Sequence, residues 1–234
     1  MAIEQSLKFN WFEIKSNVDD KTIDLRAGTP RIEYRESIFC PYVEVTGYIV
    51  DTGNTVDADD GSGGALGLLE AGYCQGTEEV VFQIEDMNGA KINLANEDGL
   101  DLRLSRTTSA KQSFQNQTYT ITAVSKEAFD NTLVDNRCRS QYSGKISDLV
   151  SLILRNNLKS VKWSTAAIDE TLNDYHEFGN DRYPFEMILD LQKLAIPNIQ
   201  TTEGKNALGN TAGYLFWQTS EGFHFRSLDK LFDT

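Results

Sequence analysis

The sequence is poor in cysteine and histidine, and this excludes several kinds of site. Only three cysteines and two histidines occur among 234 residues. Cys40, Cys74 and Cys138 are odd in number and widely spaced, which fits neither a disulfide framework nor a paired-cysteine metal site. We therefore expect free thiols in a reducing compartment. The acidic stretch 57–64, DADDGSGG, lacks the spacing and the terminal glutamate of a calcium loop, so no metal site is expected.

Long apolar runs are absent as well. No stretch approaches the roughly 20 apolar residues that a membrane-spanning helix needs. Residues 1–15 do not show a basic region followed by an apolar region, the pattern of a secretion signal. We expect a folded protein made in a cytoplasm, without a membrane partner.

Positive charge is scarce. The chain has 22 basic and 35 acidic residues, and its net charge is -13. Such a surface repels phosphate backbones, so tight binding of nucleic acid is disfavoured. A P-loop, a dinucleotide-binding glycine motif, a zinc-protease motif and a nucleophile-elbow motif are all missing. We therefore predict no catalytic residue, no cofactor and no enzyme activity.

The first half of the chain shows the alternating pattern and the turn signals of β-strands. Leu100, Leu102 and Leu104 alternate with polar residues, as expected of a strand with one buried face. The pair Asn88-Gly89 lies between two strand-like runs and is a strong hairpin signal. About seven short strands with turn signals between them predict a small antiparallel β-barrel or a sandwich over residues 1–125.

The second half changes to a helical period. Apolar residues recur at helical spacing over 146–154, with Ser143 or Ser147 as the expected N-cap. A second helix is expected over 184–195, with Pro184 in its first turn. An aromatic hairpin follows. The predicted fold class is α+β: an N-terminal β-barrel over 1–125, then a mixed α/β domain over 126–234 with two main helices and the hairpin.

Aromatic side chains of the hairpin are expected to form core. Tyr214 and Phe216 alternate toward the helix, while Trp217 points away and is the candidate contact surface. The chain has one cluster that combines histidine with acids, and we interpret it as a polar loop rather than an acid–base or metal site. It contains Asp174, His176, Glu177 and Asp181.

The order of these elements resembles the baseplate hub proteins of contractile-tailed phages, a family that includes the hub region of type VI secretion spike proteins. The stretches YPFEMILDLQKLA and YLFWQTSEGFHFRSLD carry the resemblance, and RESIF…YVEVTGYIVD carries it more weakly. The matching positions are Phe185, Leu191, Leu194, Ala195, Phe216, Trp217, Gly222, Phe225, Ser227 and Asp229.

This resemblance implies a structural role in the virion. Hub subunits form trimers, and two similar barrels per subunit make a ring that adapts the sixfold tail tube to the threefold spike. The implied partners are two further copies, the central spike, the tube or tube-initiator protein and other baseplate proteins. DNA would only pass through the channel. A second barrel is expected beyond Thr234, because the sequence contains no repeat of residues 1–125.

Two other functions are also consistent with the sequence. The first is another phage tail protein, either an adaptor or a receptor-binding module. The second is a glycan hydrolase, whose catalytic carboxylates the sequence does not identify.

If the chain forms a ring, we expect acidic side chains to line its channel and basic side chains to face neighbouring subunits and the spike. Basic side chains along the channel would bind the phosphates of passing DNA.

Overall fold

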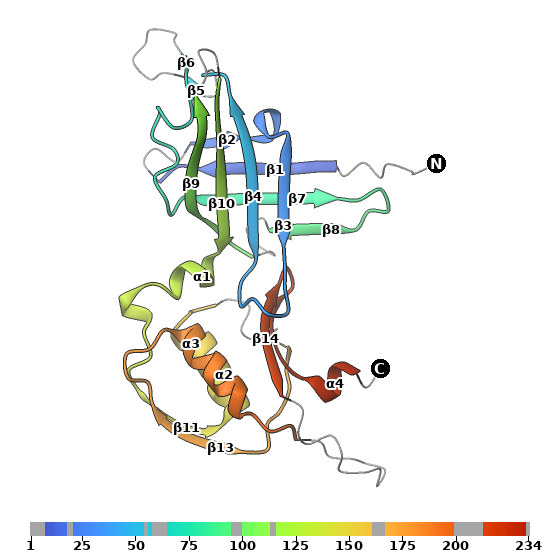
Figure 1. Ribbon diagram of the computed structural model, residues 1–234, viewed down its shortest axis with the longest axis vertical. Helices are drawn as coiled ribbons and strands as arrows, with labels where there is room; N and C mark the ends of the chain where they lie inside the picture. The colour runs from blue at the N-terminus through green and yellow to red at the C-terminus, as the bar shows by residue number, and fades with distance from the viewer. Residues whose placement is uncertain are drawn as a thin grey trace. The chain divides into compact units, whose positions relative to one another are not determined.

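The computed structural model describes residues 8–17, 21–53, 56–57, 65–94, 100–112, 116–160, 167–198 and 213–232. Within these ranges the chain is mostly β-strand (Figure 1). It divides into two compact units, which we describe separately. Unit 1 contains residues 1–35 and 44–126, and unit 2 contains residues 36–43 and 127–234.

Unit 1 is built on one antiparallel sheet of eight strands. The strand order is β2-β1-β7-β9-β10-β4-β3, and β8 pairs with β7. A short ribbon of β5 (Val56–Asp57) and β6 (Ala65–Leu66) and the 3-10 helix η1 (Arg26–Gly28) complete the described part of the unit. The strands of the large sheet are β1 (Lys8–Lys15), β2 (Thr22–Asp24), β3 (Arg31–Arg35), β4 (Glu44–Asp51), β7 (Glu79–Glu85), β8 (Lys91–Leu94), β9 (Leu102–Gln112) and β10 (Gln117–Ser125).

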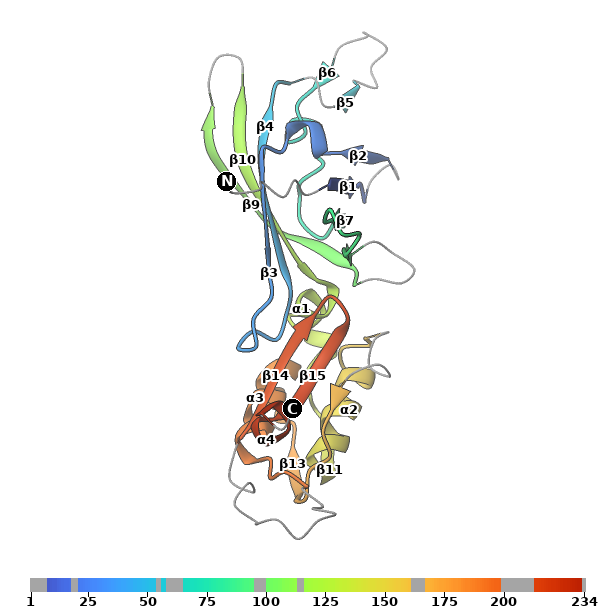
Figure 2. The same ribbon diagram turned by 90° about the vertical axis from the view of Figure 1, so that its right-hand side faces the viewer.

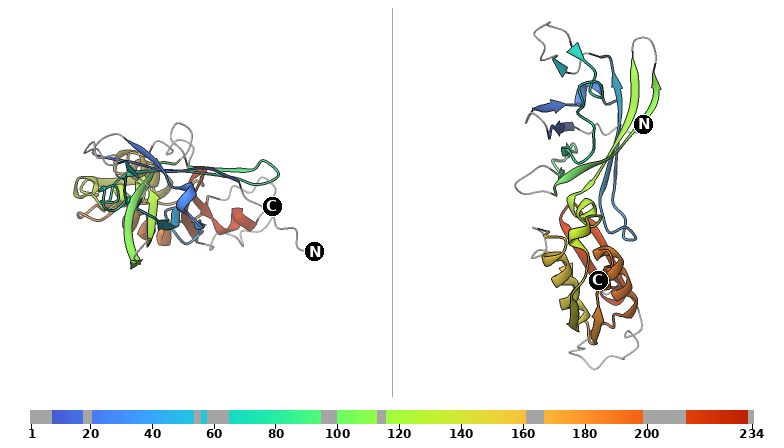
Figure 3. Two further views of the ribbon diagram at one scale, coloured as in Figure 1. Left: turned by 90° about the horizontal axis from the view of Figure 1, so that it is seen from above. Right: turned by 90° about the vertical axis from the view of Figure 1, so that its left-hand side faces the viewer.

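The predicted barrel does not form, and the prediction of an α+β fold class is wrong. Strands β2 and β3 end the strand order, and no pairing joins them among the described residues. The sheet instead folds into two layers with crossed strands, as β1 and β7 against β4 and β10 show in Figures 1 and 3. The layers join where β7 pairs with β9 at Glu79–Arg103 and Val80–Leu102.

Large side chains fill the space between the two layers. Phe12 of β1 meets Phe82 of β7 edge to face, with ring centroids 6.2 Å apart. A Cβ atom on Gly47 of β4 would lie 2.7 Å from the Phe12 ring, so only glycine lets the layers approach this closely here. A bulge in β1 shifts the register between Phe9 and Trp11. Phe9 therefore pairs on the core side, and Trp11 stays partly exposed.

Unit 2 places two helices against an aromatic hairpin, β14 (Tyr214–Thr219) and β15 (Gly222–Ser227) (Figure 2). Strand β15 also pairs in parallel with β12 (Ala167–Ile168), and β11 (Gln141–Lys145) pairs with β13 (Asp174–Phe178). The helical elements are α1 (Lys126–Asp130), η3 (Val134–Asn136), α2 (Ile146–Asn156), α3 (Pro184–Leu194) and α4 (Leu228–Phe232).

Both predicted helices are confirmed as α2 and α3, and Pro184 is the first residue of α3. The predicted serine N-cap of α2 is wrong, because Lys145 is the N-cap and its side chain makes no capping bond. The backbone N–H of Ser147 donates instead to Thr171 Oγ1 at 3.0 Å. A residue 24 positions away thus satisfies an N–H at the start of the helix, which local sequence could not indicate.

The aromatic core of unit 2 follows the predicted alternation. The rings of Phe216 and Phe223 stack at 5.5 Å, and those of Tyr214 and Phe225 stack at 4.7 Å. Phe185 of α3 meets Phe216 edge to face at 5.9 Å. Leu191 of α3 is buried in the same core. Helix and hairpin therefore share one hydrophobic core, as the sequence predicted.

Candidate functional site

Trp217, the predicted contact residue, lies on the hairpin face opposite the core. Its indole stacks on the His224 ring at 4.8 Å and 10°, and its side chain is only 7% exposed. The sequence correctly predicted that Trp217 and Phe216 lie on opposite faces of the hairpin. The alternation does not indicate which side chains cover the outer face. Only a small part of the indole is accessible in one chain. A role in partner contact stays a prediction.

His224 beside it is held in a defined orientation. Its Nε2 lies 3.0 Å from Thr219 Oγ1. Burial lowers the pKa of His224, and the Arg226 charge lowers it further, while Glu221 and Glu36 oppose this change. The folded chain therefore favours the neutral ring more strongly than the unfolded chain does.

We expect His224 to make the stability of the protein depend on pH. The unfolded chain binds the proton more readily, so the contribution is present above about pH 6.5 and is lost as pH falls below it. His224→Gln should reduce the fall in the urea midpoint between about pH 7.5 and about pH 5.5. His176→Gln, at the exposed second histidine, is the control and should retain the fall. Equal pH slopes for His224→Gln and the parent would contradict this assignment.

The structure disperses the predicted polar cluster into separate contacts. His176 Nδ1 lies 2.6 Å from Ser143 Oγ on the neighbouring strand β11. Glu177 forms an ion pair with Arg182 at 2.5 Å. Asp174 lies opposite Lys145 in the β11–β13 register. The interpretation of this cluster as a polar loop is therefore wrong for Asp174, His176 and Glu177, which lie in strand β13 and pair with β11.

Asp181, the fourth member, joins two arginines. Its carboxylate accepts hydrogen bonds from Arg139 at 2.7 Å and from Arg137 at 2.8 Å. These bonds, that of Arg139 first, lower the pKa of Asp181. A general acid in catalysis needs a raised pKa, so this carboxylate is poorly suited to that role.

Sequence reasoning missed two buried carboxylates in unit 1. Asp51 Oδ2 accepts from the Leu68 N–H at 2.7 Å and from the Tyr119 hydroxyl at 3.3 Å, and Oδ1 accepts from the Gly53 N–H at 2.8 Å. Glu78 accepts from the N–H groups of Gln75 and Gly76, both at 2.7 Å. Each carboxylate therefore fixes a loop to the sheet. An acid at the end of an apolar strand was the signal available for Asp51.

The same part of unit 1 contains the thiol of Cys74. Burial raises its pKa to about 12, and the charges of Glu78 and Asp51 act in the same direction. Burial also raises the pKa of Tyr119. A thiol with such a pKa is almost entirely protonated at neutral pH and is not a nucleophile.

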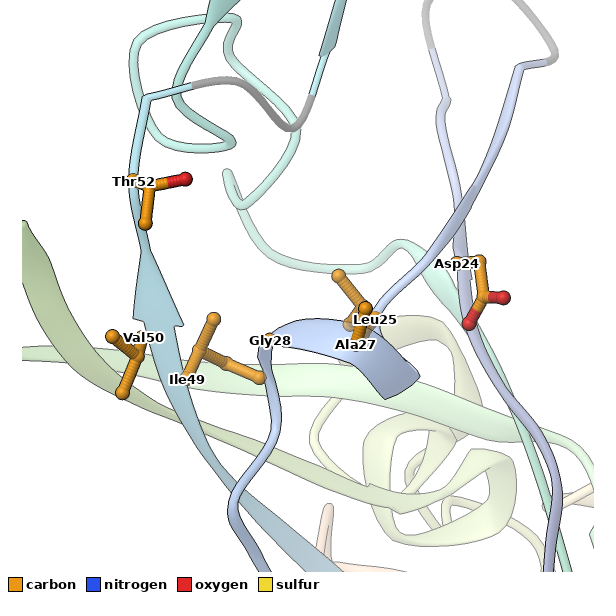
Figure 4. A pocket seen from close by; sticks show the side chains of 7 residues that line it. All are labelled: Asp24, Leu25, Ala27, Gly28, Ile49, Val50 and Thr52. Carbon is orange, nitrogen blue, oxygen red and sulfur yellow. The ribbon is translucent and has the colours of Figure 1, made fainter.

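A pocket of about 320 Å³ opens beside η1 in unit 1. Figure 4 shows mostly apolar side chains around it, with Asp24 and Thr52 on opposite sides of the view. Arg26 bonds to Asp24 and lowers the pKa of its carboxyl. The lining therefore offers no free acid or base. It consists of Asp24, Leu25, Ala27, Gly28, Ile49, Val50 and Thr52.

The part of the chain that the structure describes offers neither a metal-binding cluster nor a membrane-spanning helix. In the described ranges, no three His, Cys, Asp or Glu side chains are grouped so as to hold a metal ion. Residues 58–64 lie outside the described residues. They make up most of the acidic stretch whose sequence lacks the pattern of a calcium loop. Among the helices that the structure describes, none has the length and apolar character needed to cross a membrane.

Comparisons with known proteins found a similar fold but no related sequence. No protein-family model matches the chain, and no curated protein sequence matches it. A solved structure with a similar fold is the 43 kDa tail protein of prophage MuSo2 from Shewanella oneidensis. The two chains are 10% identical with a TM-score of 0.51, and the match covers 92% of this chain and 54% of that chain. This chain thus spans about half the length of that neighbour, and the likeness is one of fold.

Proposed function

We propose that this chain is a structural component of a phage tail, and specifically a hub subunit in the baseplate of a contractile tail. The observation that supports the proposal is the fold shared with a prophage tail protein over 92% of the chain. The finer hub assignment also draws on the order of β region, helix and aromatic hairpin, which resembles the hub family. The packing of Phe185 on Phe216 gives that helix and hairpin a structural role.

In this role three copies associate into a ring within the virion. The ring connects the sixfold tail tube to the threefold spike and contacts tube, spike and other baseplate proteins. DNA passes through its channel without being held. The domain expected beyond Thr234 stays a prediction.

Cryo-electron microscopy of tails from the parent phage and from a phage lacking this gene tests the proposal. We expect three copies of this chain at the junction of tube and spike, and no assembled baseplate when the gene is absent. Supplying the gene in trans should restore the baseplate. Density for the chain at the tip of a fibre would contradict the hub proposal and favour a receptor-binding module.

We further propose that the subunit is not an enzyme. Two acids of the polar cluster are held in ion pairs, Glu177 with Arg182 and Asp181 with Arg137.

Assembled particles carrying Glu177→Gln should therefore retain any glycan cleavage that parent particles show, because Glu177 serves the ribbon rather than a reaction. Release of sugar fragments from purified cell wall is the measurement, and assembly is checked by microscopy. Particles that assemble normally but lose cleavage would make Glu177 catalytic and contradict the proposal.

A further inference from the structure

The outward face of one layer of unit 1 has an unusual composition for so acidic a chain. Strands β3, β4, β10 and β9 are neighbours, and residues directly opposite each other lie on the same face. Tyr119, Ile121 and Ala123 of β10 face the core and are buried. Thr118, Thr120, Thr122 and Val124 therefore lie on the opposite face, where no charged side chain interrupts the row and where Thr122 is covered by its neighbours.

Basic side chains border this row. Register pairs Lys111 with Thr118, Arg106 with Thr122 and Arg103 with Val124, so all three extend from β9 on the outward face. We call Arg103, Arg106 and Lys111 the β9 stripe. Arg106 and Lys111 are exposed. No acidic side chain in the described ranges forms an ion pair with either of them.

The other charges on this face compensate one another. On β3, Arg31 forms an ion pair with Glu33, and its guanidinium lies 4.9 Å from the centroid of the Tyr48 ring. Arg35 pairs with Glu44 of β4 at 3.3 Å. Among the described residues, the positive charges of this face without an ion pair therefore lie on β9, Arg106 and Lys111 among them, at the opposite margin of the layer.

That margin is open to a partner. Strand β9 pairs with β10 along its length, but its other side pairs with β7 only at Leu102 and Arg103. The backbone of Leu104 still bonds to Thr77 and Glu78. Beyond Leu104 no described strand pairs with this side of β9, so among the described residues Arg106 and Lys111 lie at an edge of the layer.

The chain itself supplies the complementary charge. Residues 36–90 contain eleven acidic residues and no lysine, arginine or histidine. Asp51 and Glu78 are buried and Glu44 pairs with Arg35, but Glu36 and Glu70 are exposed. The whole chain carries a net charge of -13, so removing the stripe leaves an even more acidic remainder. Any second copy that approaches the stripe brings this excess with it. Complementary charge directs such encounters and sets their register.

We infer that the β9 stripe is the contact through which one copy of this chain binds the acidic surface of the next. The inference rests on the proposed hub function, because it names the surface that joins subunits of the ring. The contact is head to tail, since a basic patch on one copy meets a different, acidic patch on its neighbour. Contacts of this kind close into rings when the rotation between copies allows it.

Charge reversal on the stripe tests the inference. Arg106→Glu/Lys111→Glu should raise the dissociation constant of the assembly by at least about tenfold, because each substitution places like charges together. The control is Lys8→Glu/Lys15→Glu, which makes the same charge change at exposed positions of β1 on the other layer. Both are compared with the parent by sedimentation at low and high salt, and Arg106→Gln/Lys111→Gln provides a milder variant that keeps the β9 surface polar.

The possible results distinguish a failure of this inference from a failure of the proposed hub function. Weaker association for the stripe variants alone, with parent association also weakened by salt, supports the inference. Unchanged association of the stripe variants overturns it and leaves the hub proposal standing. A parent that stays monomeric overturns the hub proposal itself. If the parent binds duplex DNA and the stripe variants lose that binding while assembling normally, the stripe binds nucleic acid and the inference is wrong.

Discussion

Phe216→Ala is expected to lower the free energy of unfolding of unit 2 by about 3 to 5 kcal/mol, the range for removing a buried aromatic ring. Phe216 is 1% exposed, and its ring contacts those of Phe223 and Phe185. Truncation removes both ring contacts and leaves a cavity between helix and hairpin. Leu191→Ala in the same core should cost about 2 to 5 kcal/mol. The measurement is urea unfolding followed by circular dichroism.

Phe232→Ala is the matched control. This phenylalanine, in α4, is 82% exposed, so the same substitution removes little buried surface. Its unfolding midpoint should stay close to that of the parent. If Phe216→Ala behaves like Phe232→Ala, the aromatic hairpin is not part of a packed core.

Asp51→Ala is expected to destabilise unit 1 by about 3 to 5 kcal/mol, because a buried donor left without an acceptor costs about 1 to 3 kcal/mol. Three groups lose their acceptor: the N–H of Leu68, the N–H of Gly53 and the hydroxyl of Tyr119. Asp51→Asn should cost less, since its amide oxygen still accepts. Thermal unfolding of the two variants against the parent measures both costs.

Asp24→Ala is the control for Asp51→Ala, because it removes an exposed rather than a buried carboxylate from the same unit. Its ion pair with Arg26 is exposed to solvent, and exposed pairs contribute less than about 1 kcal/mol. An Asp51→Ala variant no less stable than Asp24→Ala would show that the Asp51 carboxylate does not fix the loop after β4.

Periodicity predicted local structure well where one face of an element is buried. Leu102, Leu104 and Tyr119 are buried on the faces that alternation assigned to them. Helices α2 and α3 and the Asn88-Gly89 hairpin between β7 and β8 were also predicted correctly, with Gly89 at a φ of +83°. In each case the pattern reports which side of an element avoids water, and that is a local property.

Long-range pairing could not be predicted in this way. Strand number and turn spacing are the same for a closed barrel and for an open sheet folded into two layers. Closure depends on whether the end strands β2 and β3 meet, which no local pattern encodes. The Thr171 bond at the start of α2 and the burial of Trp217 were missed for the same reason.

The molar mass of the complete protein in solution, determined by light scattering after size exclusion, tests the central proposal most directly. A hub subunit that joins the tail tube to a threefold spike should have three times the mass of one chain over a range of concentrations. A mass equal to one chain at every concentration tested would contradict the hub assignment and leave only the broader role in a phage tail.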